Sequence, residues 1–284
     1  MTTEPEPLLS VRNLRVVYPR DEGEFAAVRD VSFTLGRERL GIVGESGSGK
    51  STTGRAIMGL VPRPGRIEAQ ELRLGDIDLL RLDERGFRRL RGKRVAMILQ
   101  DPKYSLDPVM NVGRQIAETH RCHFGSSAAE ARAAALEMLA AVNIRDPERV
   151  YALYPHQVSG GMGQRVMIAM MLIAGPDLLI ADEPTSALDA TVQHQVLSIM
   201  DDLVRRRGMG LILISHNLHL VSAFCDEVLV MYAGRVVERC RAAELTQARH
   251  PYTRGLLASL PELGRRQAVL PQLRRDPAWA SDPA

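Results

Sequence analysis

Apolar and polar residues alternate along the first part of the chain. Residues 8–18 and 27–35 both show this alternation, which is typical of antiparallel strands that bury one face. Farther along, apolar residues instead gather in short continuous runs at 40–43, 95–99, 178–181 and 211–214. Runs of this length between helical patterns predict the buried strands of a parallel sheet covered on both faces. The pattern therefore predicts an α/β protein that opens with an antiparallel β subdomain.

Helical patterns lie between these predicted strands. Residues 52–60 follow a glycine-rich turn and predict a helix, and the segment from 101 to about 150 has helical character that is clearest at 128–142. Near the end of the chain, residues 228–232 and 235–238 predict a hairpin around an Ala-Gly turn. Residues 263–284 are rich in Pro and Arg and predict a poorly ordered tail.

The composition excludes several classes of protein. With 284 residues, 45% of them hydrophobic, the chain can bury a sizeable core. Its 37 basic and 34 acidic residues nearly cancel, so bulk charge does not indicate a nucleic-acid partner. The basic run at 81–94 invites that interpretation, but a solvated connection into the strand at 95–99 is favoured. The sequence shows neither a signal peptide nor an apolar run long enough to span a membrane, so no span is predicted.

The cysteines indicate no metal or redox chemistry. Cys122, Cys225 and Cys240 are far apart and form no CxxC pair. They predict neither a zinc site nor a disulfide framework, and a reducing cytosol is the expected compartment. The chemistry must therefore be sought in the polar motifs.

One glycine-rich stretch matches the phosphate-binding pattern GxxxxGK[ST] in full. It runs through Gly44, Glu45, Ser46, Gly47, Ser48, Gly49, Lys50 and Ser51, and Thr52 follows it. The glycines let the main chain wrap around phosphates and aim N–H groups at them from a helix start. Lys50 would add positive charge for the β- and γ-phosphates, and the Ser51 hydroxyl is suited to Mg²⁺. Because a strand precedes the stretch and a helix follows it, a P-loop is favoured over a glycine-rich turn without function.

Two acidic residues end one of the buried strands. Asp182 and Glu183 follow the apolar run at 178–181. Asp182 could hold Mg²⁺, directly or through water, and Glu183 could accept a proton from an attacking water. By themselves these acids more often mark a solvated strand end, so their weight comes from their position after the P-loop.

A serine and two glycines form a second candidate phosphate-binding turn. Ser159, Gly160 and Gly161 precede a helical pattern and could offer a hydroxyl and main-chain amides to an anion. The same three residues also suit an ordinary flexible turn. The stretch resembles the signature motif of the nucleotide-binding subunits of ABC transporters, which begins a helix with a Ser-Gly-Gly run.

The order of further residues strengthens this resemblance. Tyr18 lies before the P-loop where the family has an aromatic that stacks on adenine, and this role is favoured although aromatic residues near a strand end commonly belong to the core. Gln100 follows a strand as the family's Q-loop glutamine does, where it would sense Mg²⁺ and water. Asp189 falls in the D-loop, and His216 follows a strand as the switch histidine does. The resemblance covers residues 8–262 and implies that Glu183 is the general base, assisted by His216 and Gln100.

The resemblance also implies a fold and a set of partners. The expected fold is a RecA-like P-loop NTPase core with the antiparallel β subdomain at its start and a helical signature subdomain at about 101–165, all within an ATPase domain at 8–262. In the family, two ATPase subunits pair head to tail and enclose ATP and Mg²⁺ between the P-loop of one and the signature of the other. The implied partners are a second ATPase subunit, either a paralogue or another copy, two transmembrane permeases and an extracytoplasmic binding protein, with no nucleic acid. The implied location is peripheral, at the cytoplasmic face of the plasma membrane.

Two further stretches are similar to a narrower branch of the family. Residues 100–108 and 250–261 resemble the importers of peptides and nickel. The chain stops soon after the second stretch, without the cysteine-rich tail that some members carry, so no iron–sulfur cluster is predicted. Oligopeptides, dipeptides, nickel and metal chelates all stay open as cargo. A rival hypothesis is a non-transport ABC ATPase acting on DNA or ribosomes, but no heptad repeat and no second cassette occur in this sequence.

Overall fold

A computed structural model of the chain describes residues 6–99, 105–186, 188–259 and 276–280. The chain divides into two compact units. Unit 1 combines Met1–Asp83 with Ile212–Ala284, and unit 2 is Glu84–Leu211. The P-loop stretch and His216 belong to unit 1, whereas the Ser-Gly-Gly turn and the two acids belong to unit 2.

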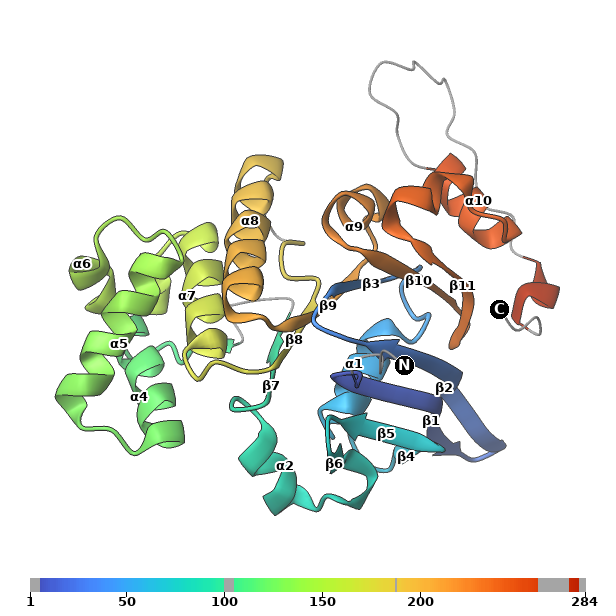
Figure 1. Cartoon of the computed structure of the whole chain (residues 1–284), viewed down its shortest axis with the longest axis horizontal. Coiled ribbons are helices and arrows are strands. Elements are labelled where there is room, and N and C mark those ends of the chain that lie inside the picture. Colours follow the sequence, from blue (N-terminus) through green and yellow to red (C-terminus); the bar gives the residue numbers. More distant parts are fainter. Residues whose placement is uncertain (1–5, 100–104, 187, 260–275, 281–284) are drawn as a thin grey trace, which may run out of the picture. The chain divides into compact units, whose positions relative to one another are not determined.

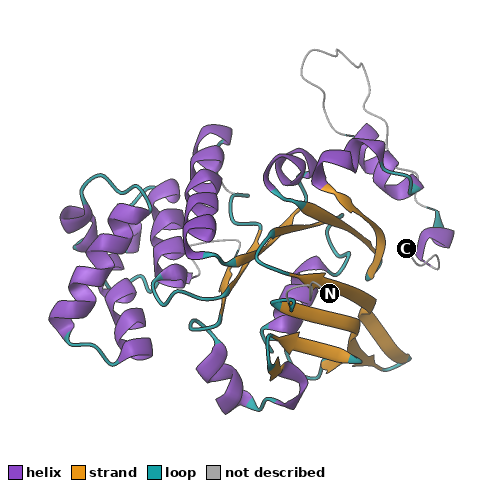
Figure 2. Cartoon of the chain, in the orientation of Figure 1, coloured by secondary structure: helices purple, strands orange, loops and turns teal. Residues whose placement is uncertain are grey.

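Unit 1 is built around two groups of strands (Figures 1 and 2). Its strands are β1 (Leu9–Arg20), β2 (Gly23–Leu35), β3 (Arg39–Val43), β4 (Arg66–Glu68), β5 (Glu71–Leu74), β6 (Ile77–Asp78), β10 (Glu227–Tyr232) and β11 (Arg235–Arg241). Its helices are α1 (Lys50–Ile57), α9 (Leu218–Phe224), α10 (Pro251–Ala258) and the short 3₁₀ helices η1 (Leu79–Arg81), η3 (Ala242–Gln247) and η4 (Pro277–Ala280). Strand β9 (Gly210–Ser215) contains the division between the units.

The antiparallel sheet of unit 1 follows from its alternating sequence. Its strands lie in the order β2-β1-β5-β6, and β4 also pairs with β1. In β1 the apolar side chains of Leu9, Val11, Leu14 and Val16 are buried, and the polar residues between them are mostly exposed. Strand β10 runs parallel to β3 and antiparallel to β11. These pairings place the end of β3, where the P-loop begins, beside the end of β10.

Unit 2 is mainly helical and contains the parallel strands β7 and β8 (Figure 2). Its elements are α2 (Glu84–Leu90), β7 (Val95–Ile98), α4 (Val112–Phe124), α5 (Ala128–Ala141), α6 (Pro147–Tyr151), the 3₁₀ helix η2 (Pro155–Gln157), α7 (Gly160–Leu172), β8 (Leu178–Asp182) and α8 (Ala190–Arg207). Strands β7 and β8 pair in parallel, and every residue of both is buried. Helices α4, α5, α6 and α7 pack against one another.

Local capping explains where several of these helices begin. Ser127 and Glu130 form a reciprocal capping box at the start of α5, which satisfies two main-chain N–H groups that the helix leaves without partners. Asp146 caps α6, whose first residue is Pro147. Helix α8 ends at Gly208 in a left-handed conformation, and three arginines occupy its last turn, where positive charge suits the helix dipole.

The predicted fold class is confirmed, with local differences. The antiparallel subdomain, the parallel pairs and the hairpin at Ala233–Gly234 all occur. The solvated connection predicted at 81–94 is wrong in part, because α2 forms within it and buries Phe87 and Leu90. Strands β4–β6 were not predicted from the pattern. The domain boundaries and the tail at 263–284 stay predictions, because residues 260–275 and 281–284 lie outside the described residues.

Candidate nucleotide-binding site

The P-loop stretch joins a buried strand to the start of a helix. Strand β3 ends at Val43, and α1 begins at Lys50 with Gly49 as its N-cap in a left-handed conformation. The first helical hydrogen bond runs from the Thr53 N–H to the Gly49 carbonyl, at 2.9 Å. Main-chain N–H groups before Thr53 therefore have no acceptor inside the helix, and the helix dipole adds positive potential at this end.

Two glycines allow this loop to pack tightly on its neighbours. A Cβ atom at Gly44 would lie 2.2 Å from the Met231 carbonyl oxygen, and one at Gly49 would lie 2.7 Å from the Ala27 carbonyl oxygen. Both residues also have positive φ, 150° and 101°, which side chains other than glycine rarely adopt. The loop can take this path only with glycine at these two positions.

A Gly44→Ala chain should therefore lose nucleotide binding and some stability. Because the added methyl meets main-chain atoms that cannot rotate away, we expect a loss of about 1–3 kcal/mol of unfolding free energy, as for other overpacked sites. Thermal unfolding and ATP binding would be measured together. Gly36→Ala is the matched control, because a Cβ there meets nothing nearer than 3.8 Å. Normal ATP binding by Gly44→Ala would contradict the proposed fit of the loop.

Lys50 is held inside the loop by main-chain oxygens. Its side chain is 5% exposed, and its Nζ donates to the carbonyl oxygens of Gly44 and Glu45, each at 2.8 Å. Buried ammonium groups require such partners, since desolvating a bare charge is costly. The loop therefore presents a fixed positive charge at the start of α1, where Ser51 is the next residue.

Two other predicted residues of unit 1 lie on strand ends. Tyr18 is part of β1 and is half-buried, and a Cβ at Gly65 would lie 2.6 Å from its ring. His216 follows β9 directly and is exposed. Behind it, the Asn217 N–H donates to Ser215 Oγ at 3.1 Å, and Asn217 caps α9.

The two acids of unit 2 differ in conformation and burial. Asp182 is the last residue of β8 and is 5% exposed. Glu183 is half-buried and has a φ of +47°, a left-handed conformation that is uncommon for residues other than glycine and recurs at functional sites. A turn follows, in which the Ser186 N–H donates to the Glu183 carbonyl at 3.3 Å. The backbone thus turns sharply at the residue proposed as the base.

The Ser-Gly-Gly turn and Asp189 both occupy helix starts. Ser159 is the N-cap of α7, and its Oγ accepts from the Met162 N–H at 3.3 Å. A Cβ at Gly161 would lie 2.7 Å from Val192 Cγ1, so α7 and α8 approach closely here. Asp189 caps α8 by accepting from the Thr191 and Val192 N–H groups. Asp189 therefore has a structural task whether or not it contacts a nucleotide.

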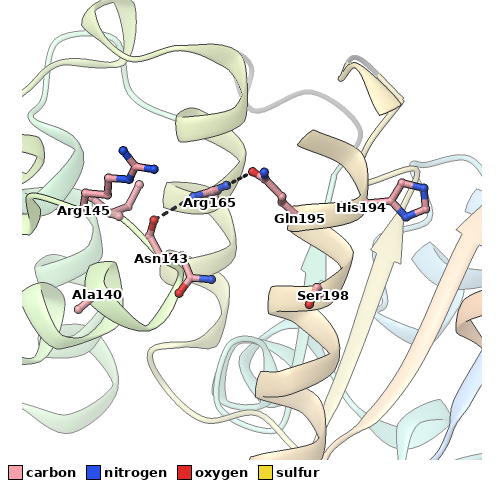
Figure 3. A pocket seen from close by; sticks show the side chains of 8 residues that line it. Ala140, Asn143, Arg145, Arg165, His194, Gln195 and Ser198 are labelled. Carbon is pink, nitrogen blue, oxygen red and sulfur yellow. Dashed lines mark hydrogen bonds between the residues drawn. The ribbon is translucent and has the colours of Figure 1, made fainter. Parts of the chain in front are cut away.

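A pocket of about 660 Å³ lies beside the middle of α7, and its lining does not include the Ser-Gly-Gly turn (Figure 3). Arg165 spans it, donating to the Asn143 carbonyl at 2.9 Å and to Gln195 Oε1 at 2.8 Å. These bonds connect α7 to the α5–α6 loop and to α8. No local sequence pattern indicates a role for Arg165, because its partners are distant along the chain.

Burial keeps two of the thiols protonated. Burial raises the pKa of the Cys225 thiol to about 12, despite the nearby Arg39 guanidinium. Burial, together with the carboxylates of Glu238, Glu244 and Glu227, raises the pKa of Cys240 to about 11. Neither thiol is a thiolate near neutral pH, the form needed for nucleophilic or metal-binding chemistry.

The residues fit a triphosphate and its Mg²⁺. Glycine turns, a helix start and Lys50 are the groups that hold phosphate chains. Mg²⁺ needs only one or two protein oxygens, since phosphates and waters supply the rest. Ser51 and Asp182 offer such oxygens, and no group of three or more His, Cys, Asp or Glu side chains forms a metal site among the described residues. Gln100, the other predicted ligand, lies outside the described residues.

The site has the structure of a P-loop ATPase. A glycine-rich loop that ends in lysine and serine joins a buried strand to a helix, and the helix begins at that lysine. Residues 28–186 match the family described as ABC transporter. The chain is 46% identical over 269 residues to the dipeptide transport ATP-binding protein DppD of Haemophilus influenzae, which covers 94% of this chain and 82% of that protein. It is 47% identical over 267 residues to the oligopeptide transport ATP-binding protein OppD of Salmonella typhimurium, covering 92% of this chain and 79% of that protein.

Solved structures give the same assignment. The dimeric ATP-binding cassette MJ0796, in a post-hydrolysis state bound to ADP and Pi, has a TM-score of 0.71 at 25% identity and covers 82% of this chain and 98% of its own. The chain belongs to the ABC transporter family, as an ATP-hydrolysing subunit of the branch that contains these peptide-transport ATP-binding proteins. Across the described part of the chain, no helix has the length and apolar character needed to cross a bilayer.

Proposed function

We propose that this ATPase subunit powers the import of peptides through two transmembrane permeases, at the cytoplasmic face of the membrane. The observation that carries this proposal is the 46–47% identity to ATP-binding proteins named for dipeptide and oligopeptide transport. Nickel and metal chelates, which the sequence left open, have less support because those relatives are named for peptides. An extracytoplasmic binding protein would select the cargo.

In the proposed mechanism, the P-loop residues bind the nucleotide phosphates and the two acids at the end of β8 take part in hydrolysis. Lys50 and the main-chain N–H groups at the start of α1 hold the phosphates, while Tyr18 supports the adenine. Ser51, Asp182 and Gln100 would hold Mg²⁺, which would neutralise phosphate charge when bound. Glu183 takes a proton from the attacking water, and His216 orients that water against the γ-phosphate.

The Ser159–Gly161 turn is proposed to act on a nucleotide held by a second ATPase subunit. This turn begins a helix and carries no lysine, so it adds a hydroxyl and amides but no full charge. ATP carries about four negative charges, and sharing it between two subunits would favour a closed pair. Hydrolysis would then weaken that pair, giving two states whose populations drive the permeases. The partner subunit is a paralogue or a second copy.

A complex isolated from membranes through a tag on this chain would test the proposal. We expect two permeases to co-purify, and we expect the reconstituted complex with its binding protein to hydrolyse ATP several-fold faster when peptides are added. Dipeptides, longer peptides and a Ni²⁺ chelate would be compared at equal concentrations. Stimulation by the Ni²⁺ chelate alone would refute the peptide assignment. Co-purification of DNA or ribosomes in place of permeases would refute transport.

A further inference from the structure

Helix α10 is fastened to β11 at its first turn. Glu238 Oε1 on β11 accepts from the Arg249 N–H at 2.6 Å and from the His250 N–H at 3.3 Å. His250 in turn caps the helix, and its Nδ1 accepts from the Tyr252 N–H at 3.1 Å. Pro251 occupies the first helical position, where its missing N–H costs nothing. These contacts fix the position of the Tyr252 main chain, from which its side chain extends.

From this position the Tyr252 side chain reaches the P-loop. Its side chain is fully buried, and its phenolic oxygen accepts a hydrogen bond from the Glu45 N–H at 3.0 Å. The Tyr232 ring packs against it, with 4.5 Å between ring centroids. The ring centroid of Trp279, in the described part of the C-terminal segment, lies 6.0 Å from the ring centroids of both tyrosines. A phenol held this firmly is a fixed acceptor rather than a chance contact.

The bonded N–H belongs to the same peptide unit as a carbonyl that holds Lys50. The Gly44 carbonyl and the Glu45 N–H share one planar trans peptide, so they point in opposite directions and turn together. Tyr252 anchors the N–H side, and Lys50 Nζ donates to the carbonyl side at 2.8 Å. Fixing one side of this plane therefore fixes the acceptor on the other side.

We propose that Tyr252 is a positioning residue of the phosphate site: its hydroxyl orients the Gly44–Glu45 peptide and, through it, the Lys50 ammonium. This inference rests on the proposed role of the P-loop in binding phosphate. It assigns a function to Tyr252, a residue of the C-terminal stretch that the nucleotide site had not otherwise used. The effect is confined to the phosphate end of the nucleotide, because neither Glu45 nor Lys50 is proposed to contact the base.

The test replaces the hydroxyl and keeps the ring. For Tyr252→Phe in the full chain, we expect ATP to bind about 3- to 10-fold more weakly, the range for losing one buried hydrogen bond. Adenosine, which has no phosphates, should bind as it does to the wild type. Hydrogen exchange of the main chain at 44–50 should become faster. Tyr151→Phe, the same chemical change in unit 2, should alter none of these readouts.

Two outcomes would overturn the inference. One is an unchanged or stronger ATP affinity in Tyr252→Phe with normal thermal unfolding. The other is an equal weakening of ATP and adenosine, which would indicate general loosening rather than orientation of Lys50. A Lys50→Ala chain, measured alongside, separates the two claims. If Lys50→Ala binds ATP normally, the proposed function fails as well; if only Tyr252→Phe is without effect, the inference alone fails.

Discussion

A Lys50→Ala chain should bind ATP at least about 100-fold more weakly and hydrolyse it at background rate. The interaction of two unit charges 4 Å apart is worth about 4 kcal/mol in partly solvated surroundings, and each 1.4 kcal/mol is tenfold in affinity. Lys50 is 5% exposed, so water screens its charge only weakly. Titration with a fluorescent ATP analogue and a phosphate-release assay would measure both effects.

Lys93→Ala is the matched control for this prediction. Lys93 lies on the surface between α2 and β7, outside every proposed site. Because Lys50 also donates to two loop carbonyls, thermal unfolding of both variants should be compared to show that the Lys50→Ala chain is folded. A folded Lys50→Ala chain with wild-type affinity would mean that the phosphates bind elsewhere.

The second large effect is expected for Glu183→Gln, which should bind ATP but hydrolyse it about 10²- to 10⁴-fold more slowly, the usual contribution of a general base. Glutamine has nearly the same shape and can keep the left-handed backbone at this position, but it cannot accept the proton. The variant should therefore accumulate a closed pair of ATPase subunits in the presence of Mg²⁺ and ATP. Phosphate release and sedimentation, with the partner subunit added, would measure the two consequences.

Glu137→Gln makes the same change on an exposed face of α5 and should leave both measurements unaltered. Unchanged hydrolysis in Glu183→Gln would remove this residue from the role of base. Slow hydrolysis without nucleotide-dependent pairing would leave the base in place and contradict the shared ATP site.

The fold was predictable wherever one periodicity dominated. The alternating pattern of β1 indicated a strand because such a strand buries one face. The apolar runs of β8 and β9 indicated strands because these bury both faces. Helix α2 was missed because arginines outnumber its two buried residues, Phe87 and Leu90. The short strands β4 and β5 were missed because their pairing depends on β1, far away in the sequence. Strand β6 was missed because it has two residues, too few for a periodic pattern, and it pairs with β5.

In the candidate site, too, some features could be predicted from local sequence patterns and others could not. The P-loop residues could be found from their local spacing, since strand, turn and helix start follow one another directly. The contact between Glu45 and Tyr252 spans 207 positions, and no local pattern encodes it. Likewise, the Gly234 N–H donates to the Ser48 carbonyl at 3.0 Å from a distant hairpin. Support for the loop comes from tertiary packing, which a single sequence does not reveal.

The position of the Ala27 carbonyl limits where the chain can accept an insertion. Cβ atoms at Gly49 and Gly234 would both lie within 3 Å of this oxygen, at 2.7 and 2.9 Å, so one point on β2 touches the phosphate loop and the β10–β11 turn at once. An insertion at the tip of the β1–β2 hairpin, at residues 21–22, leaves that point in place. An insertion between Gly23 and Ala27 moves it and shifts both glycines. Engineers who wish to graft a binding loop onto this ATPase should therefore use the hairpin tip and leave the strand behind it untouched.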